Sequence, residues 1–212
     1  KILEEVQASE IHRIADIGCG VGIHTHFLAK KFPKAKVEGY DFSKSGIAAA
    51  KRNNKLPNLI FSVEDITKAR KIENFDLITA FDVLEHIEDW KGLVKKLIKK
   101  NNKYFIFASP VGKMRPYEKK IGHFRNYKIG EIEKFMKSQG YKTVKTFYAG
   151  FPFYSPIVRN LTNAFYENKD LGPDAEMGKM GEAVHYAWYI LFRYFSLKHK
   201  GDNFIGLFEK EK

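Results

Sequence analysis

The chain has 212 residues, a hydrophobic content of 44% and a formal net charge of +12 at pH 7. This length fits one α/β domain with a well-buried core, and the apolar content is too high for a disordered chain. One cysteine excludes an internal disulfide, and without a secretory signal or a membrane-length apolar run we expect a cytoplasmic protein with no transmembrane segment.

The positive charge comes mainly from lysines that are spread along the chain. Most of them fall on the outer faces of predicted helices, which indicates a solvated surface. No basic tail and no basic-aromatic nucleic-acid motif is present in the sequence. Binding of nucleic acid is therefore possible but not favoured.

Hydrophobic periodicity predicts strands and helices that alternate along the chain. In order, the predicted elements are a helix at 2–9, a strand at 13–17, a helix from 23 closed by Pro33, a strand at 36–41, a helix at 44–54, strands at 58–64 and 75–81, a helix at 89–100, a strand at 103–110, a helix at 129–140, a strand at 141–150 and a last strand at 201–210. Such alternation predicts a mostly parallel sheet with helices on both faces.

We expect a single domain whose core comprises residues 1–150 and 201–212. Between these parts, residues 151–200 are rich in aromatic side chains, and they end in a predicted helix. We interpret this segment as a helical aromatic cap inserted before the final strand. It would serve either as a substrate lid or as a packing or dimer contact, and its basic, aromatic helix leaves a peripheral membrane contact open.

The stretch after the first predicted strand contains three closely spaced glycines, Gly18, Gly20 and Gly22. Glycines between a strand and a helix let backbone N–H groups approach a nucleotide-like ligand. The dinucleotide-binding spacing G-x-G-x-x-G is not met, because Ile23 occupies the sixth position. A phosphate-binding P-loop is also excluded, since no G-K-[ST] follows.

Together with Asp16, these glycines form D-x-G-x-G-x-G, which resembles the first motif of the class I S-adenosylmethionine-dependent methyltransferases. The resemblance is to methyltransferase types 11, 12 and 23, and more distantly to ubiquinone-pathway O-methyltransferases. It implies a Rossmann-like, doubly wound sheet of seven strands with the last strand antiparallel. It also implies S-adenosyl-L-methionine as cofactor and S-adenosyl-L-homocysteine as product.

Asp41 ends the second predicted strand, where a carboxylate can accept both ribose hydroxyls of a nucleoside. The alternative is a helix N-cap, for which Ser43 is an equally good candidate. Among the cofactor contacts we include Phe42, next in the chain, and Cys19, which the resemblance places as a small residue packed near the cofactor without a catalytic role.

The resemblance implies further cofactor contacts. Asp65 and the backbone of Ile66, after the third strand, would meet the adenine, with a plain loop acid as the alternative for Asp65. Asp16 would help to hold the methionine amino group through water. Phe81 and Asp82, after the fourth strand, would lie beside the methionine portion and the substrate opening.

We predict His123 and Asp82 as the catalytic residues. A histidine in the loop after the fifth strand could accept a proton from a hydroxyl acceptor, or it could tie down the loop instead. The segment 82–86 places Asp82, Glu85 and His86 at spacings that share one face of an α-helix. For these three residues and His123 we expect hydrogen-bonded support of the site without a metal, and the alternative is a divalent ion.

These patterns predict a methyltransferase that transfers a methyl group by in-line displacement to an oxygen or nitrogen of a small molecule. The aromatic segment favours a partly apolar or ring-bearing acceptor. Two alternatives stay open: an RNA-directed methyltransferase that uses the basic surface, and a non-catalytic module that binds the cofactor.

Overall fold

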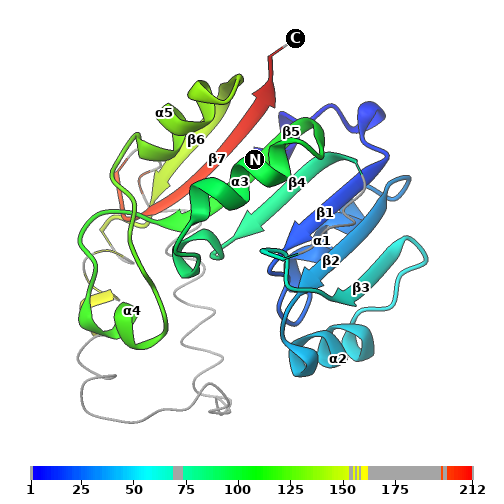
Figure 1. Ribbon diagram of the computed structural model, residues 1–212, viewed down its shortest axis with the longest axis horizontal. Coiled ribbons are helices and arrows are strands. Elements are labelled where there is room, and N and C mark those ends of the chain that lie inside the picture. The colour runs from blue at the N-terminus through cyan, green and yellow to red at the C-terminus, as the bar shows by residue number, and fades with distance from the viewer. Residues whose placement is uncertain are drawn as a thin grey trace.

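A seven-stranded sheet forms the centre of the molecule (Figure 1). The computed structural model describes residues 2–68, 74–152, 155, 157, 159–161, 197 and 200–211. The strands are β1 (Arg13–Ile17), β2 (Lys36–Asp41), β3 (Leu59–Val63), β4 (Phe75–Phe81), β5 (Asn101–Pro110), β6 (Tyr141–Ala149) and β7 (Asn203–Lys210), in the spatial order 3-2-1-4-5-7-6. β7 runs antiparallel to both of its neighbours, whereas the other pairs are parallel. The predicted Rossmann-like sheet of seven strands with the last strand antiparallel is confirmed.

The α-helices connect the strands. They are α1 (Ile23–Lys31), α2 (Lys44–Asn53), α3 (Trp90–Ile98), α4 (Pro116–Lys120) and α5 (Glu131–Ser138). All of them were predicted except α4. With five residues, α4 is too short to show a period of 3.6 residues. The predicted helix at 2–9 was wrong, since two short 3₁₀ helices at Ile2–Glu4 and Ala8–Glu10 occupy that segment.

Alternate residues of the central strands pack into two separate hydrophobic clusters, one on each face of the sheet. On one face, Trp90 of α3 and Met136 of α5 pack with Phe105 and Phe107 of β5. On the other face, Leu28 of α1 packs with apolar residues of β1, β4 and β5. Both faces are covered, as expected for a sheet built from strand–helix–strand units.

The strand order reverses between β1 and β4. From β1 the chain moves outward to β2 and β3, and then returns to β4 on the other side of β1. The loops after β1 and β4 therefore diverge at the carboxyl edge of the sheet, which opens a crevice there. The glycine turn after β1 lies at this crevice.

A buried ion-pair network holds α4 against β7. The guanidinium of Arg159, which is 1% exposed, pairs with Glu118 of α4 and lies 2.7 Å from Asp202 at the start of β7. Glu118 also accepts hydrogen bonds from the backbone N–H of Arg115 and from the amide of Asn126. The network therefore fixes the loop that follows β5.

The expected helical aromatic cap at 151–200 lies mostly outside the described residues, as do most of its aromatic side chains. The domain boundaries drawn from it stay a prediction. In the parts of the chain that are described, no helix combines the length and apolarity that crossing a bilayer requires.

Glu118→Gln should lower the free energy of unfolding at pH 7 by about 3 kcal/mol, because it leaves a buried guanidinium short of its counter-charge. Burial raises the pKa of Glu118, but the Arg115 N–H and the Arg159 guanidinium outweigh it, so the net pKa is lowered. The stabilisation is thus fully present above the ordinary glutamate pKa of about 4.3, and it is lost as the pH falls from there through the lower pKa of the folded state.

Urea unfolding at pH 7 and at lower pH, compared between wild type and variant, measures this difference. Lys142→Gln is the control, since it removes an exposed ion pair with Glu209 and should change the unfolding free energy by less than about 1 kcal/mol. An equal effect of the two substitutions would contradict the assigned importance of the network.

Candidate functional site

A cavity of about 480 Å³ opens at the reversal point of the sheet. It lies against the carboxyl ends of β1, β2, β3 and β4. Its lining consists of Gly18, Tyr40, Asp41, Phe42, Glu64, Asp65, Ile66, Thr67, Asp82, Val83, His86, Ile87, Ile121 and Gly122. This volume is typical of cavities that bind cofactors and other small molecules.

The turn after β1 forms one wall of the cavity. Gly18 has φ +68°, and a Cβ atom there would lie 2.4 Å from Cγ2 of Val83, so only glycine fits. The N–H groups of Gly18 and Cys19 donate to the carbonyl of Tyr40, at 2.7 and 3.0 Å. The turn therefore presents bare backbone toward Val83 and is tied to the end of β2.

Asp41 links this turn to the next helix. One carboxylate oxygen accepts the N–H of Gly20 and the other accepts the N–H of Ser43, each at 2.8 Å. Ser43 is the N-cap of α2, because its hydroxyl accepts the N–H of Gly46 at 3.0 Å. Asp41 is thus not needed as the cap, and it lines the cavity with a carboxylate whose remaining lone pairs can accept further hydrogen bonds.

Asp16 lies behind the turn and does not line the cavity. Its buried carboxylate accepts the hydroxyls of Thr25 and Thr79, both at 2.7 Å, which joins β1 to α1 and β4. Burial raises the pKa of this carboxyl, although the two hydroxyls act in the opposite direction.

Gly22 and Cys19 lie where the turn packs against α2 and β3. A Cβ on Gly22 would lie 2.6 Å from the ring of Phe61, so this glycine allows close packing of the helix start. Cys19 packs against the same small cluster, and burial raises the pKa of its thiol to about 12. Such a thiol is not a nucleophile at neutral pH. Neither residue lines the cavity.

The end of β3 contributes the opposite wall. Asp65 and Ile66 both line the cavity. Hydrogen bonds from Thr67, together with the ammonium of Lys68, hold the pKa of Asp65 at about 2. Phe42 is 79% exposed and also lines the cavity, so its ring offers an apolar face to a ligand.

Phe81 is the last residue of β4 and Asp82 follows it, but the two residues line different cavities. Asp82 lines the 480 Å³ cavity. The ring of Phe81 lies 4.7 Å from that of His24 and lines a separate apolar cavity of about 310 Å³ with Leu3 and Phe27. The ring of Phe81 is therefore not part of the lining of the 480 Å³ cavity.

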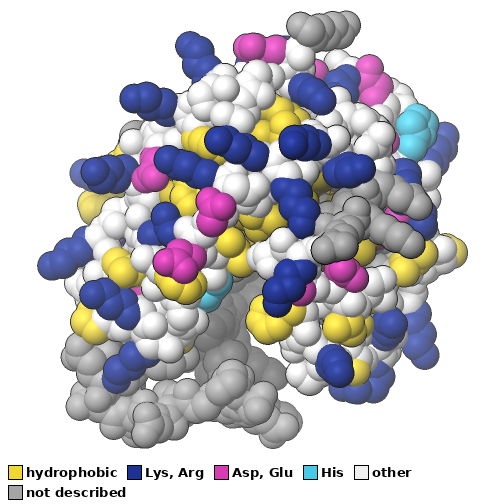
Figure 2. Space-filling view, in the orientation of Figure 1, with side chains coloured by type: hydrophobic (Ala, Val, Ile, Leu, Met, Phe, Trp, Pro, Cys, Tyr) yellow, Lys and Arg dark blue, Asp and Glu magenta, His cyan; other side chains and the backbone are white. Residues whose placement is uncertain are grey.

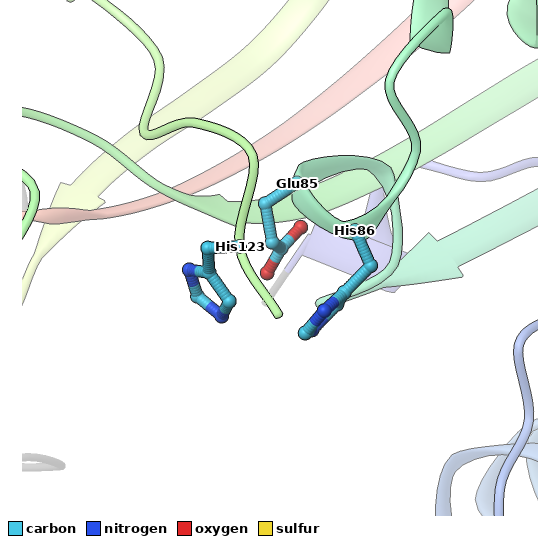
Figure 3. A group of neighbouring side chains, drawn as sticks. All are labelled: Glu85, His86 and His123. Atoms are coloured by element: carbon cyan, nitrogen blue, oxygen red, sulfur yellow. The ribbon is translucent and has the colours of Figure 1, made fainter. Parts of the chain in front are cut away.

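Three ionisable side chains meet beside the cavity. Glu85, His86 and His123 each bring one candidate ligand atom within 4.8 Å of the others, and Figure 3 shows the three side chains turned toward a common point. Glu85 and His86 belong to a short 3₁₀ helix after β4, and His123 comes from the loop after α4. His86 also lines the cavity, which connects the two spaces.

The expectation that Asp82, Glu85 and His86 share one face of an α-helix was wrong. The segment Leu84–His86 is a 3₁₀ helix, and Asp82 precedes it with φ +52°. This left-handed residue changes the direction of the chain, so Asp82 is not part of the group formed by Glu85, His86 and His123.

Burial raises the pKa of Glu85 to about 8 and lowers that of His123. Glu85 is 1% exposed, and its carboxylate accepts the hydroxyl of Ser109, at 3.3 Å. Pairs of ionisable groups with shifted pKa values gather at functional sites more often than elsewhere.

Sequence reasoning missed part of the lining. Val83, Ile87, Ile121 and Gly122 line the cavity, and Ile121 and Gly122 come from the loop after α4. The glycine at position 18 indicates that another part of the chain lies close to it. The sequence does not show that this neighbour is Val83, because that depends on the strand order.

Other hollows and charges do not converge on this site. A shallow cavity of about 560 Å³ lies between α2 and β3, and Lys51, Lys55 and Phe61 are part of its lining. On the face drawn in Figure 2, lysine and arginine side chains are numerous and are interspersed with acidic and uncharged ones.

Comparison with known proteins gives a consistent family. The family model described as a methyltransferase domain matches residues 9–187. A malonyl-acyl-carrier-protein O-methyltransferase from Bacillus anthracis is 35% identical over 85 residues, which cover 40% of this chain and 32% of that protein. A trans-aconitate 2-methyltransferase from Variovorax paradoxus is 38% identical over 98 residues, 46% of this chain and 37% of that protein. The matched segments span about a third of these relatives.

Solved structures share the fold. A coclaurine N-methyltransferase bound to N-methylheliamine and S-adenosylhomocysteine aligns with a TM-score of 0.65 at 19% identity, over 98% of this chain and 70% of that one. A magnesium protoporphyrin IX methyltransferase from Synechocystis, also with S-adenosylhomocysteine, aligns with a TM-score of 0.58 at 22% identity, over 70% of this chain and 71% of that one. From the span of the family match and this shared architecture, the chain belongs to the methyltransferase-domain family and has the class I methyltransferase fold.

Proposed function

We propose that this chain binds S-adenosylmethionine in the 480 Å³ cavity and transfers its methyl group to a small-molecule acceptor. One observation carries the proposal: the glycine turn at Gly18 and the acidic residues Asp41 and Asp65 line the same cavity. Family membership supports it, since methyltransferases of this fold use S-adenosylmethionine, which supplies a methyl group on a positively charged sulfur.

The cavity residues fit such a donor. Asp41 accepts the two ribose hydroxyls, and its two existing backbone hydrogen bonds fix the carboxylate in position to do so. Asp65 and the backbone of Ile66 hold the adenine edge, and the exposed ring of Phe42 stacks beside it. Gly18 lets the backbone approach the methionine portion without a side chain in between.

For the remaining predicted residues we propose indirect contributions. Asp16 orients the turn through Thr25 and Thr79, and it acts on the methionine amino group only through water. Cys19, Gly20 and Gly22 shape the turn from the side away from the cavity.

We place the acceptor over the end of β4, beside Asp82 and His123. Asp82 lines the cavity, and His123 follows the lining residue Gly122. These two residues orient the accepting atom toward the methyl carbon, because in-line displacement depends mainly on the position of the nucleophile.

Exposed apolar side chains around His123 favour a partly apolar acceptor. Ile121 is 45% exposed and lines the cavity, and Phe124 on the other side of His123 is 55% exposed. Apolar side chains left in water next to a polar site commonly form the wall of a ligand pocket. The acceptor would then present one polar atom to the site and pack its apolar part on these residues.

Gly18→Ala should weaken binding of S-adenosylhomocysteine and lower the free energy of unfolding, because the new methyl group overlaps Val83 in the cavity wall. Gly20→Ala is the matched control, since it introduces the same left-handed strain at φ +52° but its Cβ meets no atom within 4 Å. We expect Gly18→Ala to be the less stable variant by about 1–3 kcal/mol in urea unfolding. Equal stability and affinity of the two variants would remove the steric argument.

Asp41→Ala should weaken the binding of S-adenosylhomocysteine about 10- to 100-fold, because charged hydrogen bonds to hydroxyls are lost. Isothermal titration calorimetry measures the dissociation constant directly. Glu64→Ala is the control, since Glu64 carries the same charge into the same cavity without a proposed ribose contact. An unchanged affinity in Asp41→Ala would contradict the ribose assignment.

Release of S-adenosylhomocysteine from S-adenosylmethionine should occur when the protein is incubated with a dialysable metabolite fraction, and it should fall in Asp41→Ala. A parallel incubation with total RNA tests the RNA-directed alternative, which predicts turnover with RNA and a steep loss of binding as salt rises. Binding of S-adenosylhomocysteine without turnover in any fraction would favour the non-catalytic module instead.

A further inference from the structure

We propose that Glu85, His86 and His123 bind one divalent transition-metal ion at the acceptor side of the cavity. The ion's role in methyl transfer rests on the proposed function, whereas its binding does not. Three ligand atoms from two separate segments meet within 4.8 Å of one another, and the three side chains converge in Figure 3.

Hydrogen bonds fix the orientation of both imidazole rings. Nδ1 of His86 lies 3.2 Å from the carbonyl oxygen of Gly122, so it carries the proton and donates. Nδ1 of His123 lies 3.5 Å from the amide oxygen of Asn126, whose amide nitrogen donates to Glu118 at 3.0 Å. Each ring therefore keeps the lone pair of Nε2 for another partner, which is the arrangement found around metal-bound histidines.

Glu85 is a buried carboxyl group that no cation neutralises among the described residues. It is 1% exposed, its side-chain hydrogen bond to Ser109 is long at 3.3 Å, and the ion pairs found in the described ranges do not include it. Buried carboxylates are normally paired with a positive group or bound to a metal. A cation between Glu85 and the two histidines supplies that charge.

The donor set selects the class of ion. Two imidazole nitrogens and one carboxylate oxygen suit divalent ions of the later first transition series, whereas calcium and magnesium prefer oxygen ligands alone. Bonds of about 2.1 Å would space the ligand atoms by about 3 Å, so the side chains must close by 1–2 Å at most, roughly what side-chain torsions allow. Three protein ligands leave coordination positions open, as catalytic metal sites do.

An ion at this place would select an oxygen acceptor. A hydroxyl bound at an open position has a lowered pKa, so its proton leaves to solvent water. The oxygen then forms a bond to the methyl carbon while the carbon–sulfur bond breaks, and the electron pair stays on sulfur. Because His86 lines the cofactor cavity, the bound oxygen would face the methyl donor. In this arrangement His123 is a metal ligand and not the proton acceptor.

The test is a titration of the chelator-treated 212-residue chain, without a tag, with Co²⁺. Calorimetry and the visible absorption that imidazole and carboxylate ligands give to this ion both report its binding. We expect one Co²⁺ per chain, and at least tenfold weaker binding in Glu85→Gln and in His123→Asn. Asn126→Ala, which removes the support of the His123 ring, should weaken binding about 10-fold. His12→Gln, which removes an exposed histidine elsewhere, should bind as the wild type does.

Titration with S-adenosylhomocysteine and thermal unfolding of every variant separate the two proposals. Cofactor binding without Co²⁺ binding overturns the metal site and leaves the methyltransferase proposal standing. Co²⁺ binding without cofactor binding overturns the methyltransferase proposal and leaves the metal site standing. Co²⁺ bound equally by wild type, Glu85→Gln and His123→Asn would show adventitious binding and would also overturn the metal site.

Discussion

The position of the turn after β1 depends on the carboxylate of Asp41. Its two oxygens accept the N–H groups of Gly20 and Ser43, so one side chain joins the glycine turn to the start of α2. The carbonyl of Tyr40 takes two more N–H groups of the turn. Three of these four hydrogen bonds, from Gly18, Cys19 and Gly20, tie the turn to the end of β2. The turn is thereby held as a rigid wall, as expected for a cavity that is already formed before a ligand binds.

The sequence motif treats its three glycines alike, but the structure separates their physical reasons. At position 18 a side chain would overlap Val83 across the crevice. At position 22 it would overlap the ring of Phe61, which packs under the start of α1. Gly20 has open space around the position of a Cβ atom, so its constraint is the backbone conformation at φ +52°. Of the three glycines, Gly18 is the one that lines the cavity.

The strands and longer helices were predictable because each is long enough to show its period. β1 and β2 begin and end where the sequence pattern predicts. In β1 four of the five residues are buried, and in β2 buried residues alternate with exposed or half-buried ones over the first four positions, so each strand carries a clear hydrophobic signal. The segment 82–86 was not predictable in detail. Its geometry follows from the left-handed backbone of Asp82, which bends the chain as it leaves β4, and no local residue pattern requires this at a non-glycine position.

The grouping of His123 with Glu85 and His86 depends on contacts that sequence spacing does not contain. His123 donates its backbone N–H to the carbonyl of Glu118, at 2.9 Å, and the N–H of Phe124 donates to the carbonyl of Glu85, also at 2.9 Å. The loop after α4 is thus bonded to the 3₁₀ helix after β4, although the two are more than 30 positions apart. Their meeting is a consequence of the strand order.

Glu118 connects this acceptor side to the far end of the chain. Its carboxylate pairs with Arg159 and also accepts the amide of Asn126, and the other end of that amide faces Nδ1 of His123. A continuous series of polar contacts therefore runs from the Arg159 and Asp202 pair to the imidazole of His123. Because a buried, fully bonded polar network has few alternative arrangements, it restricts the orientation of the ring. Arg159 and Asp202, which are not among the residues that line the cavity, thereby help to orient the acceptor side.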